Sequence, residues 1–345
     1  SALRLIESGE ADFASFGRSL IADPDLPNKL MKGLREDVRP CIRCNEFCIG
    51  RIWNNHTKLG CAVNTEAMEE VRFHIEKTND PKNVVIVGAG PAGLEAARVA
   101  ALEGHKVSIY DAGDRLGGTM RTIATAEFKT KIKALADYFK VQLDKLGVDV
   151  HLNTTVTGDE DFLENADVIF VGTGTVPVTP PIPGIDSEKV VDIISAHKDA
   201  SLLKGDNIVV CGGGLSGCDA ALEYASEMGK NVTVVEMMDE CAKDAMFINK
   251  ITLFRKLAEN GVNLLTNTKV TAITDEGVEV EGPDGPAVIP ADTIVSAFGM
   301  KPLNDVAEKI DAKYHTKTRK IGDVFKPGKI GNAVREGYYA ASAID

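Results

Sequence analysis

Four of the seven cysteines lie within one short stretch, at Cys41, Cys44, Cys48 and Cys61. Disulfide frameworks are typical of short secreted chains, and a chain of 345 residues is not one of these. Four thiolates can instead hold tetrahedral zinc or a 4Fe-4S cluster. Zinc ligands usually come as two close pairs, whereas three closely spaced cysteines with a distant fourth are more typical of a cluster. We predict a 4Fe-4S cluster at these residues, with zinc as the alternative.

A glycine-rich loop follows the cysteines. Gly88, Gly90 and Gly93 have the spacing G-x-G-x-x-G, between an apolar run at residues 82–87 and a helical pattern. Such glycines allow a tight turn, a close approach of the backbone to a pyrophosphate, and close packing of helix on strand. The helix N-terminus attracts phosphate, and Asp111, after the next predicted strand, can bind a ribose. We therefore predict that a dinucleotide binds here.

The same arrangement occurs a second time. Gly212, Gly214 and Gly217 follow another apolar run, and Glu236 takes the acidic position. Since no arginine or lysine lies near Glu236 in the sequence, a 2′-phosphate would be repelled and a free 2′-hydroxyl accepted. We predict that NADH, rather than NADPH, binds this loop. The nearby Cys211 and Cys218 are interpreted as small buried thiols rather than as a redox pair.

Alternating strands and helices must position these residues. The pattern from residue 82 onward is typical of a doubly wound parallel α/β sheet, and it restarts at Asn207. A proline-rich stretch at residues 176–184 is predicted to connect the two βαβ units. The predicted strands lie at residues 82–87, 106–110, 148–152, 167–171, 208–211 and 231–235, and the helices at residues 91–103, 127–146 and 217–228.

The first 40 residues have a different pattern. Residues 11–16 are predicted as a strand, with helices at residues 19–22 and 24–33. One strand and two helices cannot form a domain, so we expect this segment to pack on something else.

The bulk composition is that of a soluble globular protein, with 44% hydrophobic and 26% charged residues. A net charge of −12 argues against nucleic acid and anionic membranes as partners. No apolar run approaches the roughly 20 residues of a membrane helix. We expect a cytoplasmic protein, and an oligomer is compatible with the sequence.

Taken in this order, these motifs resemble the C-terminal part of the multidomain old yellow enzyme family. That family includes 2,4-dienoyl-CoA reductase, 2-enoate reductase and trimethylamine dehydrogenase, and the resemblance covers essentially the whole chain. Its most specific segments are the cysteine motif, both glycine loops, and residues 16–24 and 321–338. The loop between Cys48 and Cys61 is one residue longer than in the dienoyl-CoA reductase pattern, so the branch is not assigned.

The resemblance implies an N-terminal (β/α)₈ barrel that carries FMN and the substrate site and that is missing from this chain. Residues 1–40 would then be the C-terminal remnant of that barrel, with Gly17 and Arg18 at the FMN phosphate. In the family, further FAD-binding positions match Gly117, Gly118, Thr173, Gly174 and Asp323. An aspartate at residue 323 favours FAD over the bare ADP of the amine dehydrogenase branch.

The predicted architecture is therefore α/β, with two Rossmann-like domains, one inserted in the other. Residues 41–80 form the iron–sulfur segment, residues 81–200 and 310–345 the FAD-binding domain, and residues 201–309 the NADH-binding domain. The resemblance implies that electrons pass from NADH to FAD, then to the cluster and to the FMN of the barrel, which reduces an activated C=C bond. No catalytic acid or base is assigned, because the six histidines are scattered.

Two alternatives remain. One is a stand-alone NADH-dependent reductase that feeds a separate acceptor, like the small subunit of glutamate synthase, although such a protein has no need of residues 11–33. The other is a zinc-stabilised nucleotide-binding module without catalytic activity, which would be colourless. Disulfide reduction is disfavoured because no close cysteine pair follows either glycine loop.

Overall fold

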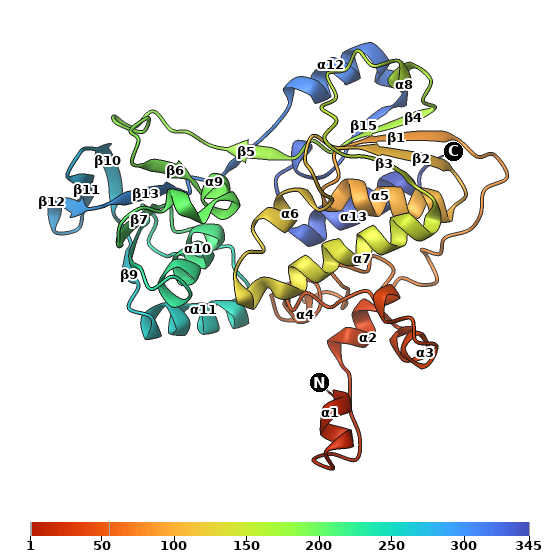
Figure 1. Cartoon of the computed structure of the whole chain (residues 1–345), viewed down its shortest axis with the longest axis horizontal. Helices are drawn as coiled ribbons and strands as arrows, with labels where there is room; N and C mark the ends of the chain where they lie inside the picture. The colour runs from red at the N-terminus through yellow and green to blue at the C-terminus, as the bar shows by residue number, and fades with distance from the viewer. Residues whose placement is uncertain (1, 55, 345) are drawn as a thin grey trace.

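The computed structural model describes residues 2–54 and 56–344 and contains two parallel sheets side by side (Figure 1). The first sheet is wholly parallel. Its strands, in spatial order, are β15 (Thr318–Lys320), β4 (Val168–Val171), β1 (Asn83–Val87), β2 (Lys106–Tyr110) and β3 (Asp149–His151).

Helices cover both faces of the first sheet, and the alternation of side chains along β1 shows why. Val84 and Ile86 face one hydrophobic core, while Val85 and Val87 face another. The first core is covered by α5 (Pro91–Leu102), α7 (Thr130–Leu146) and α13 (Ile330–Ala341), and the second by α8 (Asp161–Glu164) and α12 (Asp305–Tyr314).

The second sheet is also parallel. Its strands, in spatial order, are β6 (Val190–Asp192), β13 (Thr293–Ser296), β7 (Asn207–Cys211), β8 (Asn231–Val235) and β9 (Asn263–Leu265). On one face pack α9 (Ile193–Lys198), α10 (Leu215–Ser226) and α11 (Phe247–Glu259). On the other packs an antiparallel sheet of β10 (Lys269–Ile273), β11 (Gly277–Gly282) and β12 (Gly285–Pro290).

The chain passes between the two units through a small antiparallel pair, β5 (Thr175–Pro177) with β14 (Met300–Pro302). Since β15 then returns to the first sheet, the second unit is inserted in the first, which confirms the predicted fold class. The exact domain boundaries stay a prediction. One strand lies on the other side of the predicted boundary at residue 201: β6 precedes this residue in the chain, yet it pairs with β13 of the second unit.

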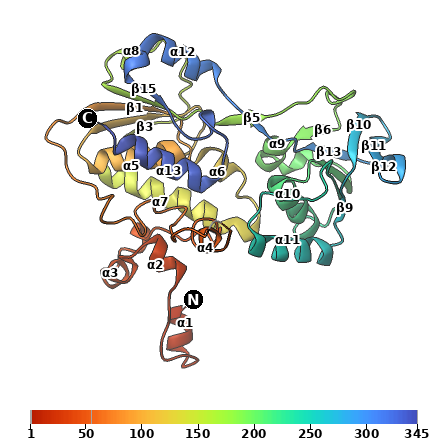
Figure 2. The same cartoon turned by 180° about the vertical axis from the view of Figure 1, so that it is seen from behind.

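The N-terminal segment extends from the body as α1 (Ala2–Glu7), α2 (Arg18–Ala22) and α3 (Leu26–Met31) (Figure 2). The strand predicted at residues 11–16 is wrong, because this stretch has no regular structure. A strand needs a neighbour to accept and donate its backbone hydrogen bonds, and the described residues offer none to this stretch.

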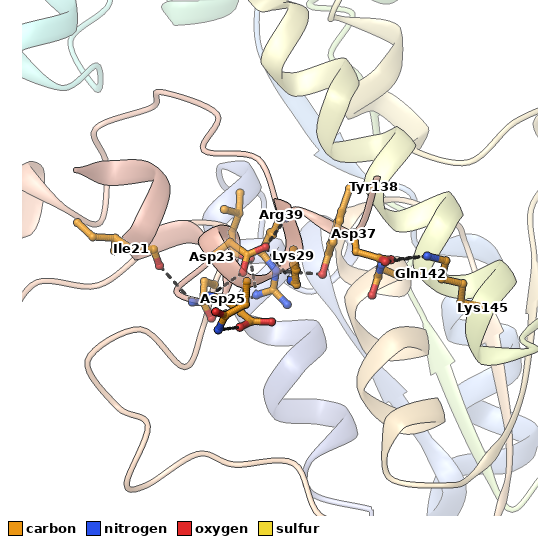
Figure 3. A network of polar contacts seen from close by, with 12 residues as sticks. Ile21, Asp23, Asp25, Lys29, Asp37, Arg39, Tyr138, Gln142 and Lys145 are labelled. Atoms are coloured by element: carbon orange, nitrogen blue, oxygen red, sulfur yellow. Dashed lines mark hydrogen bonds and ion pairs between the residues drawn. The ribbon is translucent and has the colours of Figure 1, made fainter. Parts of the chain in front are cut away.

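Polar contacts attach the following residues to α7 (Figure 3). Asp37 accepts hydrogen bonds from Lys145 Nζ at 2.7 Å and from Gln142 Nε2 at 2.9 Å. The Nε of Arg39 donates to the hydroxyl of Tyr138 at 3.2 Å. The segment before the cysteines is thereby fixed on the first unit.

The remaining helices are short. They are α4 (Ile49–Asn54), α6 (Gly118–Thr122) and the 3₁₀ turns η1 (Arg35–Asp37), η2 (Glu127–Lys129), η3 (Ala200–Leu202), η4 (His315–Lys317) and η5 (Gly322–Val324). Across the described parts of the chain, no helix is both long and apolar enough to cross a membrane.

Candidate functional site

The first glycine loop makes a turn that only glycine allows. Gly88 has φ +106°, and a Cβ there would lie 2.2 Å from the carbonyl oxygen of Gly172. A Cβ at Gly93 would lie 2.0 Å from the carbonyl oxygen of Gly88. Both contacts are with backbone, which cannot move aside, so these two glycines are required by packing.

Gly90 differs, because no atom would lie within 4 Å of a Cβ placed there. It is the N-cap of α5, so the free N–H groups and the positive end of the helix dipole face open space. Asp111 closes the loop, since its carboxylate accepts hydrogen bonds from the N–H of Ala89 at 2.6 Å and of Gly113 at 2.7 Å. The arrangement can hold an anionic group beside Gly90.

This loop opens into a cleft of about 1700 Å³. Most of the residues predicted for the FAD site line it, although they come from four separate parts of the sequence. These are Gly88, Gly90, Asp111, Gly118, Thr173, Gly174 and Asp323. Gly117 lies just behind the lining, in a left-handed conformation that starts α6, and its N–H donates to Ala89 O at 2.9 Å.

Two further strands of the first sheet contribute Thr173, which follows β4, and Asp323, which follows β15. The hydroxyl of Thr173 donates to the carbonyl of Leu303 at 2.9 Å. Asp323 accepts a hydrogen bond from the N–H of Gly328 at 3.0 Å, and burial raises the pKa of its carboxyl group. One oxygen of Asp323 therefore remains for a ligand in the cleft.

The second glycine loop repeats the geometry of the first. A Cβ at Gly212 would lie 2.2 Å from Ala297 O, and one at Gly217 would lie 2.0 Å from Gly212 O. Gly214 is the N-cap of α10 and, like Gly90, has no atom within 4 Å of a Cβ position. Each loop thus has two glycines that are required by packing and one glycine, at the helix N-cap, that faces open space.

Glu236 takes the place of Asp111 in the second loop. Its carboxylate accepts hydrogen bonds from the N–H of Gly213 at 2.7 Å and of Met238 at 2.8 Å. The glycines of the second loop do not line the cleft, but Leu215 and Ser216 between Gly214 and Gly217 do. The two loops therefore approach one cleft from different units.

The four cysteines of the motif come together around a second, small cavity. Cys41, Cys44, Cys48 and Cys61 all line it, and all four are free thiols. Within residues 2–54 and 56–344, no three metal-binding side chains converge on one point as a single ion would require. Burial raises the pKa of Cys44 to about 12 and also raises the pKa of Cys61.

The two residues predicted for an FMN phosphate lie next to the cysteines. Gly17 is exposed and caps α2, and Arg18 lines the small cavity. The guanidinium of Arg18 donates to the side-chain oxygen of Asn45. The structure therefore places Arg18 beside the cysteine segment.

The site also contains residues that the sequence interpretation missed. Asn45 and Asn249 join the cysteine segment to the second unit, and Asn45 has a left-handed φ of +60°. An asparagine directly after a candidate ligand is a weak signal of such a conformation. Nothing in the local sequence marks Asn249.

His197 is the one histidine on the cleft lining among the described residues. It is buried, its Nδ1 lies 2.9 Å from the hydroxyl of Thr125, and burial lowers its pKa to about 4. A buried, neutral imidazole of this kind contributes to packing, and no catalytic role is assigned to it.

Two dinucleotide-type loops on two parallel sheets, one inserted in the other, define a two-nucleotide oxidoreductase fold. The chain belongs to the pyridine nucleotide-disulphide oxidoreductase family, whose model matches residues 82–325. This membership supports an NAD(P)H-dependent flavin oxidoreductase with FAD and NAD(P)H as cofactors.

Individual relatives extend the match to the N-terminal segment. The chain is 36% identical to an NADH oxidase of Thermoanaerobacter brockii, covering 98% of this chain and 52% of the relative. It is 37% identical to a bilirubin reductase of Mediterraneibacter gnavus, covering 99% and 53%. A solved structure of 2-naphthoyl-CoA reductase superposes with a TM-score of 0.94 at 32% identity, covering 99% and 52%.

The chain thus spans about half the length of the relatives it matches. These matches confirm the resemblance to the C-terminal part of the old yellow enzyme-like flavin reductases.

Proposed function

We propose that this chain is the electron-transfer part of an NADH-dependent flavin oxidoreductase. The first unit binds FAD, the second binds NADH, and the cysteine segment binds a 4Fe-4S cluster. The observation that carries the proposal is the cleft, because its lining extends from the first glycine loop and the start of α10 to Cys44. A molecule bound there would touch both nucleotide units and the cysteine segment.

The size and the lining of the cleft are compatible with FAD and a nicotinamide bound together. Its volume of about 1700 Å³ exceeds the roughly 300–1,000 Å³ of an ordinary ligand pocket. The open position at Gly90 leaves room for a pyrophosphate, and Asp111 lies where an adenosine ribose would follow. Asp323, which also lines the cleft, can bind the ribityl or phosphate part of FAD, which favours FAD over ADP.

NADH is favoured at the second loop by the surroundings of Glu236. Its carboxylate is already fixed by two backbone N–H groups, and the next two side chains, Met237 and Met238, are exposed and uncharged. A 2′-phosphate would therefore meet a negative charge without a compensating cation from these neighbours.

The cysteines fit a cluster better than a single zinc ion. Four thiols surround one cavity, yet no three of the described metal-binding side chains converge closely enough for one ion. A cluster needs its ligands further apart, because each cysteine binds a different iron atom.

When bound, FAD would accept a hydride and release single electrons, and the cluster would carry one electron at a time toward the FMN of a barrel domain. The chain's own residues bind these groups and keep them apart. Cys44 is the one cysteine on the described lining of the cleft, so no thiol pair there could support disulfide exchange.

We further propose that residues 1–40 contact a barrel domain that holds FMN beside Gly17 and Arg18 and reduces an activated C=C bond of an enoate or enoyl-CoA. Arg18 supports this, because it lies beside the small cysteine cavity and carries a charge suited to phosphate. Several apolar side chains nearby are exposed, including Phe13 and Met31.

The test is an anaerobic absorption spectrum of the purified, reconstituted chain before and after addition of NADH. Flavin bands near roughly 450 nm and a broad iron–sulfur shoulder, both bleached by NADH, are expected. A colourless protein that contains one zinc ion per chain and does not respond to NADH would refute the proposal. It would favour the zinc-stabilised module instead.

A further inference from the structure

The large cleft and the small cysteine cavity share a wall. Ile42, Cys44, Asn45 and Ala62 line both spaces. Any electron that passes from a group in the cleft to a group among the cysteines must cross this wall. The position of Cys44 and Asn45 therefore matters for transfer between the two spaces.

One residue of the second unit holds this wall from the cleft side. Asn249, in the first turn of α11, lines the cleft and contacts both Cys44 and Asn45. Its side-chain nitrogen donates to the carbonyl oxygen of Cys44 at 2.8 Å. Its side-chain oxygen accepts a hydrogen bond from the side-chain nitrogen (Nδ2) of Asn45 at 2.6 Å.

The two hydrogen bonds fix the orientation of the amide of Asn249. A flipped amide would place its oxygen against the carbonyl oxygen of Cys44, which is also an acceptor. Asn45 has a left-handed backbone, which asparagine adopts more readily than most residues, and its side chain is held by the hydrogen bond to Asn249. Its side-chain oxygen in turn accepts from Arg18, so one chain of hydrogen bonds joins Arg18, Asn45 and Asn249.

Residues shortly before Asn249 are also linked to the cysteine segment, one through Lys329 and one directly. Lys329 of the first unit donates to Glu46 at 3.0 Å and to the carbonyl of Asp244 at 2.6 Å. Met246 lies against Gly50, where a Cβ would come within 3.1 Å of its sulfur. The stretch that leads into α11 is therefore a docking edge of the second unit, and Asn249 is its contact with Cys44.

We propose that Asn249 is a positioning residue for electron transfer. Through Asn249, the NADH-binding unit fixes Cys44 in the shared wall and makes the cluster bound by the cysteines easier to reduce. This inference rests on the proposed function. An N–H donor aimed at the carbonyl of a cluster ligand places positive partial charge near the cluster and favours its reduced form. Loss of that donor makes the cluster harder to reduce.

The test compares Asn249→Ala and Asn249→Asp with the wild-type chain. Asn249→Ala removes both hydrogen bonds. Asn249→Asp keeps an acceptor for Asn45 but replaces the donor to Cys44 O by a negative charge. Asn165→Ala is the matched control, because Asn165 is exposed and donates one hydrogen bond to a backbone carbonyl, Asp161 O at 3.0 Å, on the far side of the first sheet.

The midpoint potential of the cluster is measured by a redox titration followed by electron paramagnetic resonance. It should become more negative in the order wild type, Asn249→Ala, Asn249→Asp, while Asn165→Ala matches the wild type. The rate of cluster reduction by NADH should fall roughly fivefold in Asn249→Ala, which corresponds to one neutral hydrogen bond. A purely structural role would lower cluster content without this ordered shift.

Equal potentials in the wild type and Asn249→Ala would overturn the inference and leave the proposed function intact. If Asn249→Ala does not retain the cluster, Asn249→Asp decides, and a potential equal to that of the wild type overturns the inference. A wild-type chain with no NADH-reducible cluster signal would instead refute the proposed function, and this inference with it.

Discussion

At the residue scale, the glycines of each loop divide into two kinds. Gly93 and Gly217 are needed by the fold, because a Cβ there would overlap a backbone carbonyl. Gly90 and Gly214 cap helices and face open space, so the fold does not need them. Under the proposed function, their role is to let a ligand approach, which makes a matched pair of substitutions informative.

We predict that Gly90→Ala folds with a loss of less than about 1 kcal/mol but binds FAD weakly, since the new methyl group occupies the space for the pyrophosphate. Gly93→Ala should lose about 3 kcal/mol or more of stability, because neither backbone segment can yield. Thermal unfolding and titration with FAD measure the two effects. Normal FAD affinity in Gly90→Ala would contradict the proposed site.

A second prediction concerns the choice between NADH and NADPH. Glu236→Gln removes the negative charge but keeps an oxygen for the N–H of Gly213, and Met237→Arg adds a cation at an exposed position. The double variant should raise the affinity for NADPH relative to NADH by about tenfold or more, because a hydrogen bond to a charged group contributes free energy of that size. Nucleotide titrations measure it, with Glu236→Gln alone as the control. An unchanged ratio would show that another segment reads the 2′ position.

At the scale of elements, the contact of η1 with α7 decides how firmly the N-terminal segment is held (Figure 3). The hydrogen bond from Lys145 lowers the pKa of Asp37 below its ordinary value. A lowered pKa in the folded state stabilises the contact above the unfolded-state pKa. The stabilisation is then lost as the pH falls through the folded-state pKa. Because Lys145 is half exposed, the contact contributes no more than about 1 kcal/mol.

We therefore predict that Asp37→Asn increases proteolysis of residues 18–39 at neutral pH. The difference from the wild type should shrink only as the pH falls below the ordinary aspartate pKa of about 3.9, and it should vanish below the still lower folded-state pKa of Asp37, where the wild-type carboxylate is also protonated. Limited proteolysis across this pH range provides the measurement. Asp25→Asn is the control, since Asp25 accepts its side-chain hydrogen bond from Asn28 within the same segment. A difference that persists at low pH would mean that Asp37 acts through packing.

At the scale of the whole molecule, the arm before α2 contributes little to the body of the protein. Residues 4–10 are exposed, and the side chain of Phe13 is 91% exposed. The backbone N–H groups of Ser8, Gly9 and Ala11 donate within the arm. We expect the arm to gain its packing partner only from a barrel domain.

Removal of residues 1–16 should accordingly change the melting temperature by less than about 2 °C. Removal of residues 1–39 should lower it clearly, because the contacts of Asp37 and Arg39 with α7 are lost. Scanning calorimetry of the two shortened chains tests this. A large loss from the first deletion would show that the arm packs on the body.

The sequence alone was sufficient for the two βαβ units, their glycine loops and the grouping of four cysteines. These features are local, since a turn, a helix start and an apolar strand are encoded within about ten residues. The strand predicted at residues 11–16 failed for the complementary reason, because a strand exists only through its neighbours.

Only the tertiary structure decided how the pieces meet. Asn45 and Asn249 are 204 residues apart in the chain, and Asp37 and Lys145 are 108 apart, yet each pair is joined by a hydrogen bond. Such contacts depend on how whole sheets and helices pack, and no local pattern records them. The single cleft that brings Gly90, Asp323 and Cys44 together is likewise a product of packing, because β15 returns to the first sheet only after the entire second unit.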